Sequence, residues 1–273
     1  MRFIKRLAII LMFFINVQLF SQESIIFVHG RGGQCGNDYT QDAGNYWGNA
    51  KNINTSLPRF FVHYDGYSDP RTWGNCRAQS KLYQVLEDRC LRSRGQSCVI
   101  ICHSAGCYAT EYFIATRDVS RYNIRFVFNS SSAAGGSELA NLAFWNSGNM
   151  DDALKTGNAR GSYNHNDMKG IPFYMLAGFK GWWYTAAILP GEDDGAVSFH
   201  STCAMNTTGS FSNCNSGTRY SMHFIWTGRS TVSSWNNNRN GYDRQHSGDG
   251  SDAINTATRQ EWDACRNLNL GCR

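Results

Sequence analysis

The stretch S-C-V-I-I-C-H-S-A-G-C-Y-A, residues 97–109, decides the fold that we expect for this chain. Residues 98–102 form a short apolar run with β-branched side chains, which is typical of a buried strand. Residues 107–116 have the length and composition of a helix. Ser104 lies on the sharp turn between them, with a small residue two positions before it and another two positions after it. This pattern is that of the G-x-S-x-G nucleophile elbow.

Cys102 stands where this elbow usually has glycine. Large side chains at the two flanking positions would collide, because the strand and the helix approach each other closely there. Cysteine is small, so the sequence still predicts the elbow, with a more crowded turn. The alternative interpretation is an ordinary strand and turn in which Ser104 only caps the following helix.

Residues 1–21 have the pattern of a secretory signal peptide. Its basic start is followed by an apolar run over residues 7–20 and a small residue at a possible cleavage point. The basic residues are Arg2, Lys5 and Arg6. An uncleaved membrane anchor is the alternative, but the apolar run is short for a membrane span. We therefore expect a mature chain, residues 22–273, that is secreted or periplasmic and keeps no membrane span.

The formal net charge of +5 falls to +2 without the three basic residues of that segment. The basic balance is mostly part of the targeting segment, so the sequence predicts no nucleic-acid partner.

All ten cysteines lie in the expected mature chain, and an even number in an exported protein predicts disulfides. Pairing of sequence neighbours gives four expected bridges, Cys35–Cys76, Cys90–Cys98, Cys203–Cys214 and Cys265–Cys272. Cys102 and Cys107 remain, either as two buried thiols or as a fifth bridge. The cysteine and histidine spacings do not predict a zinc site.

Alternation of short apolar runs with helical patterns predicts an α/β fold. Strands are expected at residues 24–28, 59–64, 98–102, 123–128, 172–177 and 219–226, and helices at residues 76–92, 107–116 and 251–265. The expected architecture is one domain with a mostly parallel central sheet, helices on both faces, and ligand chemistry at the carboxyl ends of the strands. Residues 139–170 interrupt the pattern, either as a small cap or lid over the site or as a surface excursion with one helix.

A serine nucleophile needs a histidine base and a carboxylate that orients the base, and on this kind of sheet the chain order is serine, acid, histidine. Three acidic residues precede a glycine in the stretch E-D-D-G, residues 192–195. We favour Asp194, directly before the glycine, with Asp193 as the second choice. The alternative is a solvated acidic turn with no catalytic role.

Several histidines are candidates for the base. His246 is favoured, because a loop after the last expected strand can bring its side chain onto the serine. His223 lies inside the expected strand 219–226 and is the alternative, while His200 is a third choice, only six residues after Asp194. His103 adjoins the nucleophile and is expected to be packed and hydrogen-bonded.

The oxyanion of the reaction needs hydrogen-bond donors. The elbow offers the backbone N–H of Ala105, and the glycine-rich turn H-G-R-G-G, residues 29–33, offers a second, which we assign to Arg31. His29 is expected to buttress this turn. The turn lacks the G-x-x-x-x-G-K-[ST] pattern of a phosphate-binding loop.

Four stretches resemble the α/β-hydrolase superfamily, and in particular its secreted bacterial lipases and esterases. They are F-V-H-G (27–30), C-H-S-A-G (102–106), G-G-S-E-L-A-N-L (135–142) and D-D-G-A-V-S-F-H-S (193–201). The resemblance covers residues 25–201 and implies a reduced sheet that lacks the family's first two strands. In the family, the aspartate before the glycine of the fourth stretch is catalytic, which supports Asp194. The resemblance also implies hydrolysis of a small-molecule or lipid ester through an acyl-enzyme, without a cofactor.

Other functions remain open at this point. The same three residue types serve amide, thioester or polyester cleavage and acyl transfer, and an inactive hydrolase fold could serve as a surface-binding module. The aromatic residues Phe144, Trp145, Trp182, Trp183 and Tyr184 line either an acyl pocket or the core. Asp249, Ser251 and Asp252 form either a calcium-binding loop or, more simply, a polar turn. We therefore predict no metal.

Overall fold

The computed structural model describes residues 22–142, 148–165, 167–178, 180–191, 193–202, 241–242, 245–247, 254–267 and 271–273. Six strands within these residues form one sheet in the order β2-β1-β3-β4-β5-β6. They are β1 (Gln22–Val28), β2 (Arg59–Val62), β3 (Gln96–His103), β4 (Ile124–Ser130), β5 (Phe173–Gly178) and β6 (Gly241–Tyr242). Every pair of neighbours is parallel. All the carboxyl ends therefore meet at one edge.

The central strands are buried on both faces, as their continuous apolar sequences predict. Ile26 and Ile100 point into one core, and Ile25 and Val99 point into the other. Adjacent residues go to opposite faces because side chains alternate along a strand.

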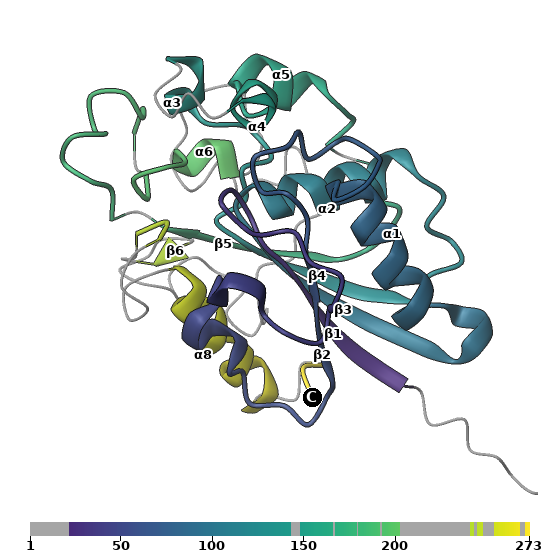
Figure 1. Cartoon of the computed structure of the whole chain (residues 1–273). Helices are drawn as coiled ribbons and strands as arrows, with labels where there is room; N and C mark the ends of the chain where they lie inside the picture. The colour runs from purple at the N-terminus through teal and green to yellow at the C-terminus, as the bar shows by residue number, and fades with distance from the viewer. Residues whose placement is uncertain are drawn as a thin grey trace, which may run out of the picture.

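Helices cover both faces of the sheet (Figure 1). The helices α1 (Ala78–Arg89) and α2 (Ala105–Thr116) contribute to the first core. The short helical turn η2 (Gly48–Lys51) and helix α8 (Ile254–Asn267) contribute to the second. Two further turns, η1 (Ala43–Asn45) and η3 (Arg92–Arg94), lie in the connections. The predicted parallel sheet with helices on both faces is confirmed. Among the described residues no helix has the length and hydropathy for crossing a bilayer.

The element boundaries differ from the predicted ones at several places. Helix α2 begins at Ala105, two residues earlier than predicted, because the backbone becomes helical directly after the elbow. The strand predicted at residues 219–226 lies outside the described residues. The described edge strand beyond β5 is β6, and the sequence pattern did not predict it.

The predicted cap region contains three short helices, α3 (Glu138–Asn141), α4 (Asn149–Ala153) and α5 (Thr156–Gly161). They gather above α2 and near α6 (Phe199–Thr202) in Figure 1. The region is thus richer in helices than a surface excursion with one helix. Its role as a cap stays a prediction.

Three of the predicted disulfides are confirmed, Cys35–Cys76, Cys90–Cys98 and Cys265–Cys272. The open question about Cys102 and Cys107 has an answer, because the two residues form a bridge. Cys203 and Cys214 lie outside the described residues.

Candidate active site

The turn between β3 and α2 has the backbone geometry of a nucleophile elbow. Ser104 adopts φ 56° and ψ −129°, a conformation that is strained for a residue with a side chain. Its backbone N–H donates to the carbonyl of Ser130 at 3.1 Å, and its own carbonyl accepts from Ala133. These bonds to the neighbouring strand's end hold the strained turn in place.

The small residues around the turn are required by contacts with β1. A Cβ on Gly106 would lie 2.2 Å from the carbonyl oxygen of His29, and one on Gly30 would lie 2.6 Å from the Cβ of Ser104. At the other flanking position the side chain of Cys102 is tolerated, because it reaches the first turn of α2 and is bonded to Cys107. The expected crowding is thus resolved by a covalent link.

His246 lies against the hydroxyl of Ser104, although 142 residues separate them in sequence. The distance from Nε2 of His246 to Oγ of Ser104 is 2.8 Å. Nδ1 of the same ring lies 2.9 Å from Oδ2 of Asp194. A carboxylate can only accept, so Nδ1 carries the proton and donates, which leaves Nε2 free to accept from the serine hydroxyl.

Asp194 is buried, and both of its carboxylate oxygens accept hydrogen bonds. Oδ1 accepts from the backbone N–H groups of Ala196 and Val197, at 3.0 Å and 2.8 Å. Oδ2 accepts from the hydroxyl of Ser131 at 2.6 Å as well as from His246. Burial by itself would raise the pKa of Asp194, but His246 and these donors outweigh it and the pKa is lowered. The group is therefore ionised at neutral pH.

Asp193, the second choice for the acid, is directed elsewhere. Its Oδ1 accepts from the backbone N–H of Gly195 at 2.8 Å. Burial is the main cause that raises the pKa of Asp193 to about 6. The geometry thus separates two adjacent aspartates, since only Asp194 faces the histidine.

The remaining candidate bases do not reach the serine in the described structure. Nε2 of His200 lies 3.3 Å from Oε1 of Glu138 and 3.2 Å from the guanidinium of Arg160. The Nε2 of His103 bonds to the backbone carbonyl of His246, not to the serine hydroxyl. His223 lies outside the described residues, as do Asp249, Ser251 and Asp252.

The glycine-rich turn after β1 lies beside the elbow, and His29 buttresses it. Its Nε2 accepts from the backbone N–H of Tyr64 at 3.2 Å, so Nδ1 carries the proton and donates to the carbonyl of Gly30 at 3.0 Å. Burial lowers the pKa of His29 to about 4, which keeps the ring neutral. Ala105 is the first residue of α2, where backbone N–H groups have no partner within the helix. The assignment of Arg31 and Ala105 as oxyanion donors stays a prediction.

Two residues of this site were missed in the sequence. Ser131 follows β4 at the same sheet edge, and the run S-S-S at residues 130–132 could have indicated polar groups there. Tyr46 lies in the connection between β1 and β2, where no pattern marks it, and its hydroxyl bonds to Nδ1 of His103 at 2.6 Å.

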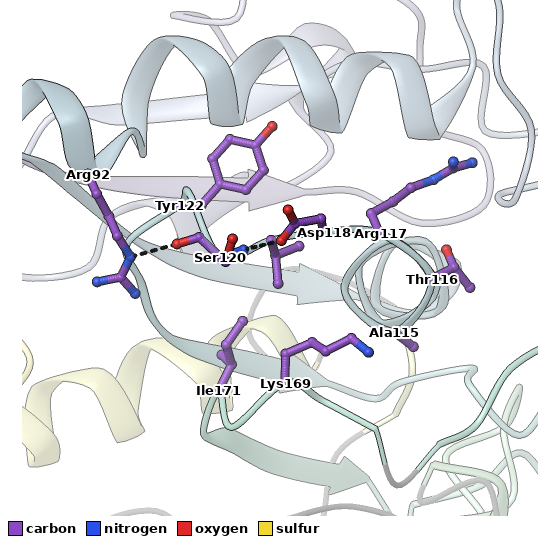
Figure 2. A pocket seen from close by; sticks show the side chains of 10 residues that line it. Arg92, Ala115, Thr116, Arg117, Asp118, Ser120, Tyr122, Lys169 and Ile171 are labelled. Atoms are coloured by element: carbon purple, nitrogen blue, oxygen red, sulfur yellow. Dashed lines mark hydrogen bonds between the residues drawn. The ribbon is translucent and has the colours of Figure 1, made fainter.

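A pocket of about 530 Å³ lies at the far end of α2, and Figure 2 shows the residues that line it. A helix of 12 residues, about 18 Å long, separates this cavity from Ser104. Two of its charged side chains bond to the backbone of Ser120. Arg92 donates to the carbonyl of Ser120, and Asp118 accepts from its N–H. Within the described ranges, no group of three or more His, Cys, Asp or Glu side chains is placed to hold a metal ion.

Comparisons with known proteins give structural neighbours alone. No family model and no curated sequence matches the chain. The mature form of a Bacillus licheniformis lipase, BlEst2, matches with a TM-score of 0.50 and 18% identity, over 75% of this chain and 84% of that one. Its propeptide form matches with a TM-score of 0.50 and 20% identity, over 66% of this chain and only 42% of that one.

A Staphylococcus hyicus lipase matches less well, with a TM-score of 0.45, 11% identity, and coverage of 67% and 80%. At such identities the likeness concerns the fold and not the activity. Together with the parallel sheet and the strained strand–turn–helix at Ser104, the likeness to BlEst2 shows that the chain has an α/β-hydrolase-like fold.

Proposed function

We propose that this protein is a serine hydrolase that cleaves carboxylic esters through an acyl-enzyme. One observation carries the proposal, the unbroken line of hydrogen bonds from Asp194 through His246 to Ser104. In the proposed roles, Ser104 is the nucleophile, His246 is the general base and Asp194 fixes the ring. Such a line is what a serine hydroxyl needs, because it is a weak nucleophile on its own.

In the first step, Oγ of Ser104 attacks the ester carbonyl carbon while its proton passes to Nε2 of His246. The carbonyl oxygen becomes an oxyanion, which the backbone N–H groups of Ala105 and Arg31 stabilise. Asp194 stays ionised and stabilises the imidazolium that forms. The positive φ at Ser104 supports this role, since it presents the hydroxyl at the top of the sheet.

The tetrahedral intermediate collapses when His246 gives its proton to the leaving alkoxide. An alcohol departs, and the acyl group stays bound to Ser104. Water then attacks the acyl carbon, with His246 as base, and the carboxylic acid is released. No cofactor takes part in this proposed cycle.

The substrate class we propose is a small-molecule or lipid ester with an apolar acyl group. Its support is the aromatic segment directly before the acid loop. Trp182 packs against Gly195 of that loop, and the next two side chains, Trp183 and Tyr184, are 89% and 48% exposed. Exposed aromatic side chains are well suited to contact apolar ligands.

We also propose that the protein works outside the cytoplasm, secreted or periplasmic. The four bridges of the described residues support this location, because structural disulfides form and persist in oxidising compartments.

Labelling with a fluorophosphonate tests the nucleophile, and a series of nitrophenyl esters of increasing acyl length tests the reaction. We expect wild type to be labelled and to hydrolyse the esters, and Ser104→Ala to do neither while it melts at the wild-type temperature. Ser201→Ala, which changes another buried serine, is the control and should be labelled normally. A folded wild type that the probe leaves unmodified would show that the fold serves a binding role instead.

A further inference from the structure

The elbow residue His103 connects the three loops that meet at the candidate site. Its Nε2 lies 3.0 Å from the backbone carbonyl oxygen of His246, and its Nδ1 lies 2.6 Å from the hydroxyl of Tyr46. The phenol oxygen of Tyr46 also lies against Gly30, since a Cβ on that glycine would be 2.8 Å from it. One relay of contacts therefore runs from the glycine-rich turn, through the elbow, to the loop of the proposed base.

We infer that His103 is a positioning residue for the proposed base His246, with Tyr46 fixing the tautomer of its ring. This inference deepens the proposed function and rests on it for its catalytic meaning. His103 does not contact the serine hydroxyl through its ring, so its effect on the reaction passes through His246.

The chemistry of the partners determines the tautomer of His103. The carbonyl of His246 can only accept, so Nε2 of His103 carries a proton and donates it. A neutral ring then has an acceptor at Nδ1, which matches the hydroxyl of Tyr46 as donor. Burial, with a smaller effect from His246, lowers the pKa of His103 to about 3, so the ring carries one proton at neutral pH. Burial likewise raises the pKa of Tyr46, and the phenol keeps its proton.

The relay matters because His246 lies in a loop and not in a helix or a longer strand. Two hydrogen bonds hold its backbone. The N–H of His246 donates to the carbonyl of Asp194 at 2.7 Å, and its carbonyl accepts from Nε2 of His103. The two imidazole rings also pack, with their centroids 4.7 Å apart. Loss of the bond from His103 would free one side of this residue and let its ring move off the serine.

The backbone next to Tyr46 is held in place by contacts of the following residue. The next residue, Trp47, donates its backbone N–H to Asp42 at 3.1 Å and packs on Phe27 with a centroid distance of 5.0 Å. The hydroxyl of Tyr46 therefore has a fixed place from which it donates to His103. The relay links rigid structure around β1 to the backbone of His246.

Substitutions at His103 and Tyr46 test the inference. His103→Met removes the donor at similar volume, whereas in His103→Gln the side-chain amide can still donate to the carbonyl of His246. We expect His103→Met to lower kcat about 100-fold, since a small misplacement of a catalytic group has this effect, with KM within about twofold of wild type. His103→Gln should recover most of the loss, and Tyr46→Phe should lower kcat about tenfold.

A spectroscopic measurement accompanies the kinetics. The Nδ1–H proton of His246, which is bound to Asp194, gives a far-downfield ¹H NMR resonance in such an arrangement. We expect this resonance in wild type and in His103→Gln, and its loss or broadening in His103→Met. Tyr122→Phe is the control, because it removes another tyrosine hydroxyl bond, to Glu87, away from the relay. It should leave kcat and the resonance unchanged.

The inference is overturned if His103→Met keeps the wild-type kcat and resonance, or if His103→Gln is as impaired as His103→Met. Should His103→Met not fold, Tyr46→Phe decides by the same two measurements. A wild type with no hydrolysis and no labelling would refute the proposed function alone, because the resonance of His246 still reports whether His103 positions it.

Discussion

Cys102 and Cys107 are joined by a disulfide that spans the turn on which Ser104 lies, with their Cα atoms 4.8 Å apart. The bridge connects the end of strand β3 to the first turn of helix α2, and both cysteines are fully buried. It occupies the position where the elbow motif usually has glycine. The strained backbone of Ser104 is thus fixed covalently as well as by packing.

We expect the double variant Cys102→Ala/Cys107→Ala to lose about 2–3 kcal/mol of stability, as removal of a short-loop bridge does. Its kcat should fall as well, because the serine is no longer held at its strained φ. The measurements are urea unfolding and hydrolysis of a nitrophenyl ester at a temperature where both proteins are folded.

Cys265→Ala/Cys272→Ala is the matched control, since that bridge spans seven residues compared with five and lies at the end of α8. It should lose similar stability and keep its activity. Equal kcat in both double variants would show that the bridge at the elbow is structural only.

The two adjacent aspartates of the acid loop should differ in their effect on catalysis. Asp194→Asn keeps the shape but donates from an amide, which favours the wrong tautomer of His246, and a loss of about 10⁴-fold in kcat is expected. Asp193→Asn should keep an acceptor for the N–H of Gly195 and nearly full activity. Steady-state kinetics of both variants decides the assignment, which reverses if Asp193→Asn is the inactive one.

Ser131 should set how far the activity extends into acid. Its hydroxyl donates to Oδ2 of Asp194, so Ser131→Ala raises the pKa of this carboxylate. We expect the acid limb of the kcat/KM profile to move to higher pH and kcat at pH 8 to fall about tenfold. In Ser132→Ala the lost bonds are to Glu111 and to the backbone N–H of Ala134, not to Asp194, so the acid limb should stay in place. An unshifted profile in Ser131→Ala would contradict the role.

The predicted cap is tied to the glycine-rich turn by an ion pair between Arg31 and Asp151 of α4, at 3.1 Å. Because the backbone of Arg31 is a proposed oxyanion donor, Asp151→Asn should loosen this donor and lower kcat/KM about tenfold. Asp152→Asn is the control, since its pair with Lys155 is exposed to solvent. Ester hydrolysis by both variants tests this, and equal kcat/KM values would separate the cap from the turn.

The free energy of unfolding should fall with decreasing pH already at pH values above those at which most carboxylates titrate. The pKa values of His29 and His103 are lowered to about 4 and about 3, so between pH 6.5 and 4 each of these rings takes up a proton in the unfolded chain but not in the folded one. The raised pKa of Asp193, about 6, offsets one of these two protons, whereas the lowered pKa of His63 adds to them. Stability should therefore decrease by at least about 1.4 kcal/mol for each pH unit as the pH falls through this window.

Urea unfolding at pH 7, 6 and 5 measures this slope. His103→Gln removes one of the histidine contributions and should flatten the dependence, whereas Asp193→Asn should steepen it. A stability that rises toward pH 5 would contradict the sign.

The sequence by itself determined the architecture and the elbow at Ser104. Runs of apolar residues, alternating or continuous, mark the strands. The small residues around the serine reflect a close approach of strand and helix that larger side chains would prevent. The apolar runs and the elbow are local features, so they can be recognised without knowledge of distant contacts.

Only the tertiary structure decided which side chains meet. Asp193 and Asp194 are identical in type and adjacent, and the fold of their turn alone directs one of them to His246. The bonds from Ser131 and Tyr46 join residues far apart in sequence, because parallel strands gather their carboxyl ends at one edge. The bridge across the elbow depends equally on the distance between β3 and α2, which sequence spacing does not specify.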